Sequence, residues 1–225
     1  FIIILFLIFR LNLGATTNAE ICRNSLVLRN QPLGDLVVPI DCKTSYLCIS
    51  GGQDCESTTS EKIKVDPKDK EEIMKAIAEE MSECWWQLGE GKIDFRADLR
   101  ESGTDVTCFI CSTVDFDNTL QGEQTIPYHV FYSYLGNTKK TISQTYLQYL
   151  YSTNDLASLS QDNVNSNLEF DKSYVILAAA SKQGIKSYIP FVRLYQDVKF
   201  LPPLILEKNK ENYDKIGCNE FINTA

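Results

Sequence analysis

The sequence predicts an α+β fold, in which one mixed domain with a mostly antiparallel sheet follows an N-terminal hydrophobic segment. Three features support this: a helical pattern in residues 66–95, a strand pattern in residues 106–116, and eight cysteines beyond the apolar start. Helical and strand patterns are interspersed without a regular βαβ alternation, which favours α+β over doubly wound α/β. We expect a hydrophobic segment at 1–19, a cysteine-rich lead-in at 20–65 and a globular domain at 66–225.

Length and charge narrow the classes of function. The chain has 225 residues, with 22 basic and 30 acidic side chains and a formal net charge of -8. This length suits one domain. No basic run is longer than two residues, so we expect no nucleic-acid partner, because phosphate binding needs a basic face. With a single histidine in the chain, we expect no metal site and no cofactor.

The chain begins with an uninterrupted apolar run, F-I-I-I-L-F-L-I-F, in residues 1–9. As a helix this run spans about 14 Å, roughly half of a bilayer core. It is either the distal end of a single-pass transmembrane anchor or the core of a signal peptide with T-N-A at 17–19 as the cleavage site. Both alternatives place the main domain outside the cytoplasm, membrane-bound in the first case and secreted in the second.

The cysteines agree with export. Their even number permits a closed set of four disulfides, which is typical of oxidising compartments. Eight cysteines allow 105 connectivities, so the pairing stays open. The candidates are Cys22, Cys42, Cys48, Cys55, Cys84, Cys108, Cys111 and Cys218.

Four of these cysteines lie in residues 20–61, a stretch rich in Pro and Gly with a short apolar run. We interpret the stretch as a loop-like lead-in that disulfides staple to the globular domain.

The helix predicted in residues 66–95 begins at Asp66 as N-cap, with Pro67 in the first turn and Gly89 as the stop. At 100° per residue, its apolar side chains fall on one face and describe a long amphipathic helix. These are Ile73, Ile77, Met81, Cys84 and Leu88.

The elements that follow are read from β-branched, aromatic and turn residues. Residues 92–95 can begin a strand, and 106–116 are the best strand candidate of the chain. Aromatic-rich helices are expected from residue 128 to Gly136 and over 143–151.

The C-terminal part is expected to hold a strand hairpin and a short last strand. The hairpin pairs residues 172–180 with 187–195 around Gly184. Pro202 and Pro203 delimit the last strand at 204–206, and a charged tail follows.

Cys108-Phe109-Ile110-Cys111 is the one compact motif. A thioredoxin-type redox pair should open a helix, and a zinc site needs a tight turn and further ligands, whereas this motif lies within a strand pattern. The structural interpretation is favoured, because a separation of three sends the two side chains to opposite faces of a strand.

One of those two cysteines must point to the core, where the apolar face of the 66–95 helix also docks. We therefore expect Cys84 to pair with Cys108 or Cys111, with a buried free thiol as the alternative.

Other polar residues could form a hydrolytic or calcium site. Glu90 in G-E-G and the D-F-D carboxylates Asp115 and Asp117, on one strand face, are candidates for a carboxylate pair. His129 could assist them. Solvated turn carboxylates and a packed or exposed histidine are the commoner interpretation, and the tyrosines between Tyr128 and Tyr151 are expected to pack rather than line a ligand groove.

Three motifs carry a resemblance: Cys22-Arg23-Asn24-Ser25, C-W-W-Q-L-G-E-G-K-I-D-F from Cys84, and C-F-I-C-S-T-V-D-F-D from Cys108. Together, over most of the chain, they resemble a set of uncharacterised membrane-anchored proteins of archaea with small genomes. The resemblance implies an extracytoplasmic location and carries over no catalytic residue.

We therefore expect a non-enzymatic, membrane-tethered extracytoplasmic domain with a structural role in the cell envelope or a role in binding another envelope protein. The alternative is an extracytoplasmic thiol–disulfide oxidoreductase that uses Cys108 and Cys111.

Overall fold

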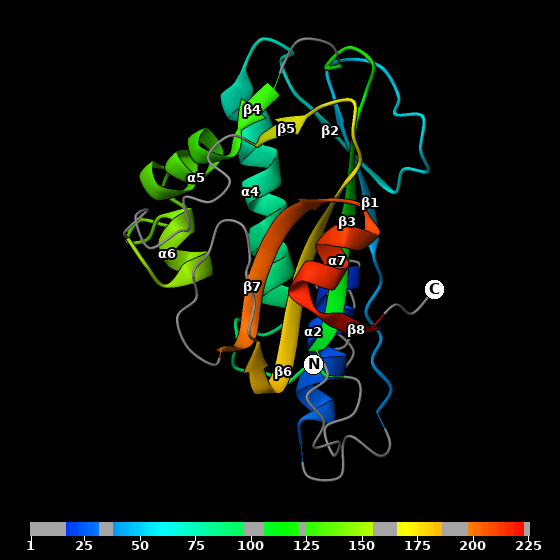
Figure 1. Cartoon of the computed structure of the whole chain (residues 1–225), viewed down its shortest axis with the longest axis vertical. Coiled ribbons are helices and arrows are strands. Elements are labelled where there is room, and N and C mark those ends of the chain that lie inside the picture. The colour runs from blue at the N-terminus through cyan, green and yellow to red at the C-terminus, as the bar shows by residue number, and fades with distance from the viewer. Residues whose placement is uncertain are drawn as a thin grey trace, which may run out of the picture.

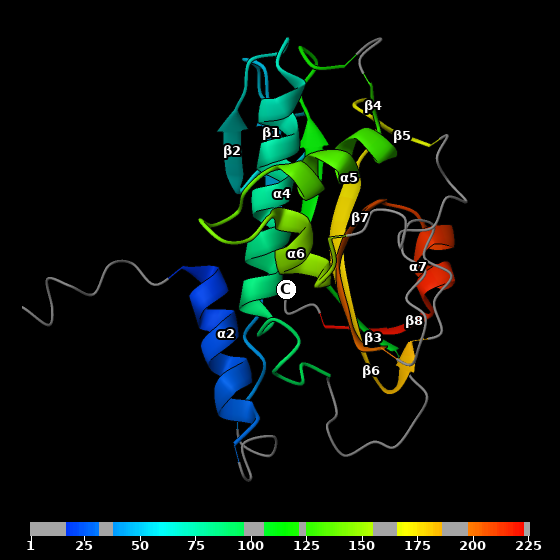
Figure 2. The ribbon, with the colours of Figure 1, turned by 90° about the vertical axis from the view of Figure 1, so that its left-hand side faces the viewer.

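The computed structural model describes residues 17–31, 38–96, 106–121, 125–154, 166–185 and 198–222. Within them a six-stranded sheet has the order β2-β1-β3-β6-β7, with β8 also paired to β3. Helix α4 lies along one side of this sheet and α7 lies on the other side (Figures 1 and 2). The α+β class with a mixed sheet is confirmed.

The prediction of a mostly antiparallel sheet is wrong. Strand β1 is parallel to both β2 and β3, and β8 is parallel to β3, while β6 pairs antiparallel with β3 and β7. The reason is the crossover: α4 connects β2 to β3 and returns the chain, so that β3 runs in the same direction. The strands are β1 (Ser45–Ser50), β2 (Glu61–Lys64), β3 (Val106–Phe116), β6 (Tyr174–Ile185), β7 (Val198–Glu207) and β8 (Cys218–Phe221).

Strand β3 confirms the predicted strand with the same bounds. It lies between β1 and β6, and each of its residues is buried or half-buried. A strand covered on both faces needs apolar or β-branched side chains at nearly every position, which Val106–Phe116 provides.

Helix α4 runs over Lys70–Gln87, and its N-cap is Asp69, whose side chain accepts a hydrogen bond from the backbone N–H of Glu71. The predicted cap, Asp66, instead accepts from the N–H of Lys68 and closes a turn that precedes the helix. Every predicted inward-facing side chain from Ile73 to Leu88 is buried.

Residues 92–95 do not form a strand. Gly89, Glu90 and Gly91 follow the helix with φ values of 82°, 56° and 72°. Three left-handed residues in succession wind the chain tightly, and the N–H of Lys92 bonds to the carbonyl of Gly89. This conformation is incompatible with an extended strand directly after the helix.

The prediction that residues 20–61 are loop-like is also wrong. They contain most of helix α2 (Asn18–Arg29) as well as strand β1. A capping box between Thr17 and Glu20 starts α2, so the 17–19 stretch that could be a cleavage site forms the first turn of a helix. Few residues of α2 are buried, which explains why no apolar periodicity marked it.

The second member of the predicted hairpin, residues 187–195, lies outside the described residues. The first member lies in β6, which pairs instead with β7. Pro202 and Pro203 do not delimit β7 but lie within it, at the edge of the sheet. An edge strand tolerates proline because its outer side needs no donor.

The remaining elements cover the edges. Helices α5 (Tyr128–Asn137) and α6 (Tyr146–Tyr151) form where aromatic helices were predicted, although α5 continues past Gly136 and α6 begins at a Thr145 cap. Strands β4 (Thr125–Pro127) and β5 (Asn167–Glu169) form a separate pair, and α7 (Lys210–Ile216) lies in the predicted charged tail. No helix of the described residues is both long and apolar enough to span a bilayer.

Candidate functional site

All eight cysteines are paired, as the even number predicted. The bonds are Cys22–Cys42, Cys48–Cys55, Cys84–Cys111 and Cys108–Cys218. The first ties α2 to the chain before β1, the third ties α4 to β3, and the fourth ties β3 to β8. Two of the four bonds therefore reach the central strand β3, one from α4 and one from β8 near the C-terminal end of the described chain.

The Cys84–Cys111 bond is one of the two alternatives predicted for Cys84. Both side chains are buried, with exposures of 1% and 3%. Cys108 and Cys111 are thus bonded to different elements and not to each other, so the predicted alternative of a Cys108–Cys111 redox pair is not formed. Within the described chain, no cluster of three or more His, Cys, Asp or Glu side chains could hold a metal ion.

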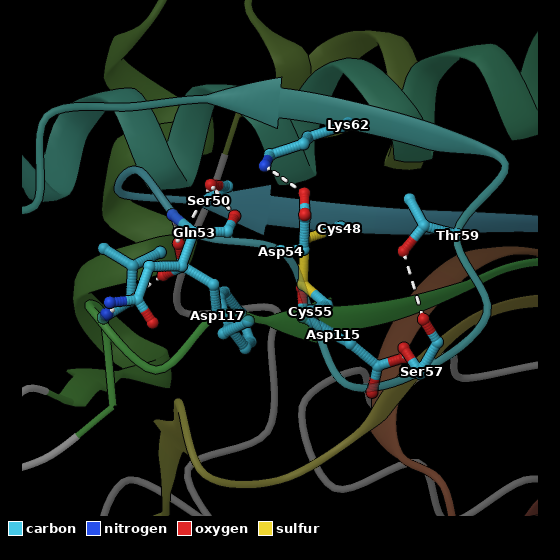
Figure 3. The surroundings of a disulfide bond; sticks show 12 residues. Cys48, Ser50, Gln53, Asp54, Cys55, Ser57, Thr59, Lys62, Asp115 and Asp117 are labelled. Atoms are coloured by element: carbon cyan, nitrogen blue, oxygen red, sulfur yellow. Dashed lines mark hydrogen bonds and ion pairs between the residues drawn. A yellow bond between two sulfur atoms is a disulfide. The ribbon is translucent and has the colours of Figure 1, made fainter.

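The Cys48–Cys55 bond closes an exposed loop at the carboxyl ends of β1 and β3. Figure 3 shows this disulfide between Lys62–Asp54 on one side and Ser57–Asp115 on the other. Lys62 Nζ lies 2.6 Å from Asp54 Oδ1. The carboxyl edge of parallel strands is a common place for ligands, so free chemical groups in this loop would mark a candidate site.

Asp117, a D-F-D candidate, is fully buried under this loop. Its Oδ2 accepts from Ser50 Oγ (2.9 Å), Gly52 N (3.1 Å) and Gln53 N (2.6 Å). Its Oδ1 accepts from Thr119 N and Oγ1 and from Leu120 N. Burial alone raises the pKa of Asp117, but these hydrogen bonds outweigh it and hold the pKa well below 3.8. A carboxylate whose oxygens are both occupied in this way holds the loop and offers no base.

The loop fits against this carboxylate because residue 51 is glycine. A Cβ at Gly51 would collide with Thr119 Oγ1 and Pro67 Cγ. The S-G-G-Q sequence therefore lets the backbone approach Asp117 closely.

Asp115 is engaged separately. It accepts from Ser57 Oγ at 2.6 Å and from Ser173 Oγ. Asp117 lies just beyond the end of β3, so the two carboxylates do not form the predicted pair on one strand face. Their partners make both of them structural links between β3 and neighbouring loops.

Glu90 and His129 are not brought together with those carboxylates. Glu90 accepts from Tyr149 OH at 3.0 Å and pairs with Lys92 Nζ at 3.2 Å. Burial raises the pKa of Glu90, but the Tyr149 and Lys92 hydrogen bonds outweigh it and lower the pKa. His129 is exposed on α5. The gathering of these groups that a hydrolase would need is not found.

Glu80 is a carboxylate that the sequence interpretation missed. It lies between α4 and β1, where Ser45 Oγ donates to its Oε1 at 3.1 Å. Burial raises the pKa of Glu80 to about 7, and Glu61 and Glu83 add to the effect. The helical periodicity could have indicated this position: at 100° per residue, Glu80 falls about 20° from Ile73, at the border of the apolar face.

The tyrosines between Tyr128 and Tyr151 mostly pack, as predicted. Tyr128, Tyr132, Tyr146 and Tyr151 are buried. Tyr146 OH donates to Glu79 Oε1 at 2.5 Å.

A separate contact joins α2 to α4. The Arg23 guanidinium of α2 lies 4.8 Å from the Trp86 ring centroid and donates to the Trp86 carbonyl. Aromatic and charged groups thus lock α2 and α6 onto α4.

Comparison of the chain with protein-family models, with curated proteins and with solved structures finds no match. The resemblance to membrane-anchored archaeal proteins stays a prediction.

Proposed function

We propose that this protein is a non-enzymatic, membrane-tethered extracytoplasmic domain that serves the cell envelope, either as a structural part or by binding another envelope protein. Residues 1–9 supply the tether in this proposal, and the disulfide-braced domain stands outside the cytoplasm.

The observation that carries the proposal is the complete pairing of the cysteines in four disulfides. Disulfides persist in oxidising compartments and are rare in the cytosol of most organisms. Buried pairs such as Cys84–Cys111 are inaccessible to attacking thiolates, which suits bracing and not turnover.

The start of α2 supports retention of the segment over its cleavage. Thr17 Oγ1 accepts from Glu20 N at 3.2 Å, and Glu20 Oε2 accepts from Thr17 N at 3.0 Å. Cleavage after Ala19 would remove this cap, which typically contributes about 1 kcal/mol to a helix. It would also remove Ala19, whose side chain is buried.

A partner-binding role is supported by the surface where α2, α4 and α6 meet. Trp86, Tyr149 and Arg23 are all half-buried there. Trp, Tyr and Arg are the residue types enriched in protein interfaces. Their rings and guanidinium are already held in place by one another and by Glu90, so little entropy is lost on binding.

The proposal is tested by membrane fractionation and redox titration of the full chain, expressed with export in a bacterial host. We expect the protein to stay with membranes after an alkaline wash and to show no free thiol. We expect the four bonds to resist glutathione, with potentials below about -300 mV. A pair that equilibrates readily with glutathione would favour the oxidoreductase, and release by the alkaline wash would contradict the tether.

A further inference from the structure

The loop between α5 and α6, residues 138–145, is a rigid projection with an apolar tip. The N–H groups of Lys140 and Thr141 bond to the Gln144 carbonyl at 2.9 and 3.1 Å. At the base of the loop, the Tyr146 N–H bonds to the Thr138 carbonyl. Ile142, at the tip, is fully exposed. A preordered loop that displays an apolar side chain loses little conformational entropy when it binds a surface.

Helix α2 also presents apolar side chains to solvent. Val27 is 39% exposed and Leu28 is 56% exposed, whereas Cys22 and Leu26 on the inner side are fully buried. Together with Ile142 they make up three of the six most exposed large apolar residues of the described chain. Half of these six residues therefore belong to two short segments.

These two segments project to the same side of the molecule. In Figure 2, α2 and the loop between α5 and α6 both reach the left-hand side, and α7 lies on the right. A flat surface on the left would contact α2 and the loop together and leave α7 distant from it.

The short stretch between the apolar run and α2 limits how far α2 can lie from the proposed tether. Seven residues, 10–16, separate the apolar run from Thr17, where α2 is capped. Fully extended, they span at most roughly 25 Å. If residues 1–9 lie in a bilayer, the start of α2 must lie within that distance of it.

The charges around the loop indicate the kind of lipid surface. Lys139 is exposed, and Lys140 pairs with Glu79 at 3.1 Å. Glu83 lies close enough to Lys140 for their charges to interact, and the whole chain carries a net charge of -8. An anionic surface would repel this chain, so a zwitterionic surface is the better match.

We propose that the 138–145 loop and the outer side of α2 rest on the zwitterionic surface of the bilayer that holds residues 1–9, with Ile142 inserted at the headgroup level. This inference rests on the proposed function, and it adds a fixed orientation to the tethered domain.

The test uses the full chain reconstituted in phosphatidylcholine vesicles, with and without bromine atoms on the acyl chains near the headgroups. Ile142→Trp places a fluorophore at the loop tip, and Asp214→Trp places one on the exposed side of α7 as the matched control. The unsubstituted chain gives the background from Trp85 and Trp86. Non-reducing peptide mapping verifies that both variants keep the four disulfides.

We expect the fluorescence added by Ile142→Trp to fall roughly two-fold or more in brominated vesicles, and that added by Asp214→Trp to stay unchanged. Absence of quenching at position 142 in chains that float with the vesicles would overturn the docking and leave the tether intact. Equal quenching at both positions would also overturn it, because the domain would have no fixed orientation. Chains that do not float would overturn the tether and the docking with it.

Discussion

Two halves of the molecule are held together by different means. The half formed by α2, β1, α4, β3 and β8 contains all four disulfides. The half formed by α5, α6 and β7 contains no cysteine and is packed by aromatic side chains. There, the hydroxyls of Tyr151 and Tyr128 donate to the carbonyls of Pro203 and Ile205 on β7.

For helices α2 and α6, the difference follows from how much apolar area each helix can bury. In α2 the buried side chains are small or few: Ala19, Cys22, Ser25 and Leu26. In α6 nearly every residue is a Tyr or Leu, and four of six are buried. Because α2 buries little apolar area, it gains little from the hydrophobic effect, and the Cys22–Cys42 bond adds a covalent link there.

Edge strand β7 shows how tyrosine side chains hold the half of the molecule that contains no cysteine. On edge strand β7 the two prolines offer no N–H, and tyrosine hydroxyls occupy carbonyls that would otherwise face outward. Both features prevent the strand from pairing with another chain. The tyrosines predicted as packing residues thus also protect an edge.

The largest expected effect comes from the disulfides of the braced half. Replacing both Cys108 and Cys218 by Ala should lower the free energy of unfolding by about 4–5 kcal/mol, because the bond closes a long loop of 110 residues. Urea unfolding measures this change. As the comparison, Cys48→Ala with Cys55→Ala opens a loop of 7 residues and should cost about 2 kcal/mol. Equal losses would mean that loop entropy is not what these bonds contribute.

The second effect concerns Glu80, a destabilising carboxyl group inside the braced half. Its folded pKa of about 7 lies above the ordinary 4.5. Between these pH values the unfolded chain loses the proton and the folded chain keeps it, so stability falls as pH rises from 4.5 to 7. Glu80→Gln should remove this slope and raise stability at pH 8 by up to about 3 kcal/mol.

Thermal unfolding between pH 4 and 8 checks the Glu80 prediction. Glu71→Gln, at an exposed position of the same helix, is the control and should leave the slope in place. If the Glu80→Gln variant kept the wild-type pH dependence, Glu80 would not be the group responsible.

The smallest effect is expected in the aromatic half. Tyr151→Phe removes a hydrogen bond of 2.8 Å to the Pro203 carbonyl and should destabilise by about 1 kcal/mol or slightly more, since a buried acceptor loses its donor. Tyr128→Phe, whose bond to Ile205 is 3.5 Å long, should cost less. Hydrogen exchange of β7 measures both, and a larger loss for Tyr128→Phe would contradict this ranking.

Part of the candidate site could be predicted from the sequence. The closed set of cysteines and the link from Cys84 to the 106–116 strand followed from counting, helical periodicity and strand alternation. The hydrogen bonds that occupy Asp117 Oδ2 could not be predicted, because their donors lie in a loop more than sixty residues away, as with Gln53. Glu80 was visible in the helical periodicity, but its burial depends on β1, which the sequence did not mark as a neighbour.

The sequence by itself determined the elements with strong local signals: β3, from its run of β-branched and aromatic residues, and α4, from its apolar stripe and its acidic first turn. Tertiary structure decided the direction of the strands, the place of β7 with its prolines at an edge, and which cysteines meet. The physical reason is the distance along the chain over which each effect acts. Backbone preference and side-chain periodicity act over a few residues, whereas strand direction and disulfide partners depend on how α4 crosses from β2 to β3 and packs on the sheet.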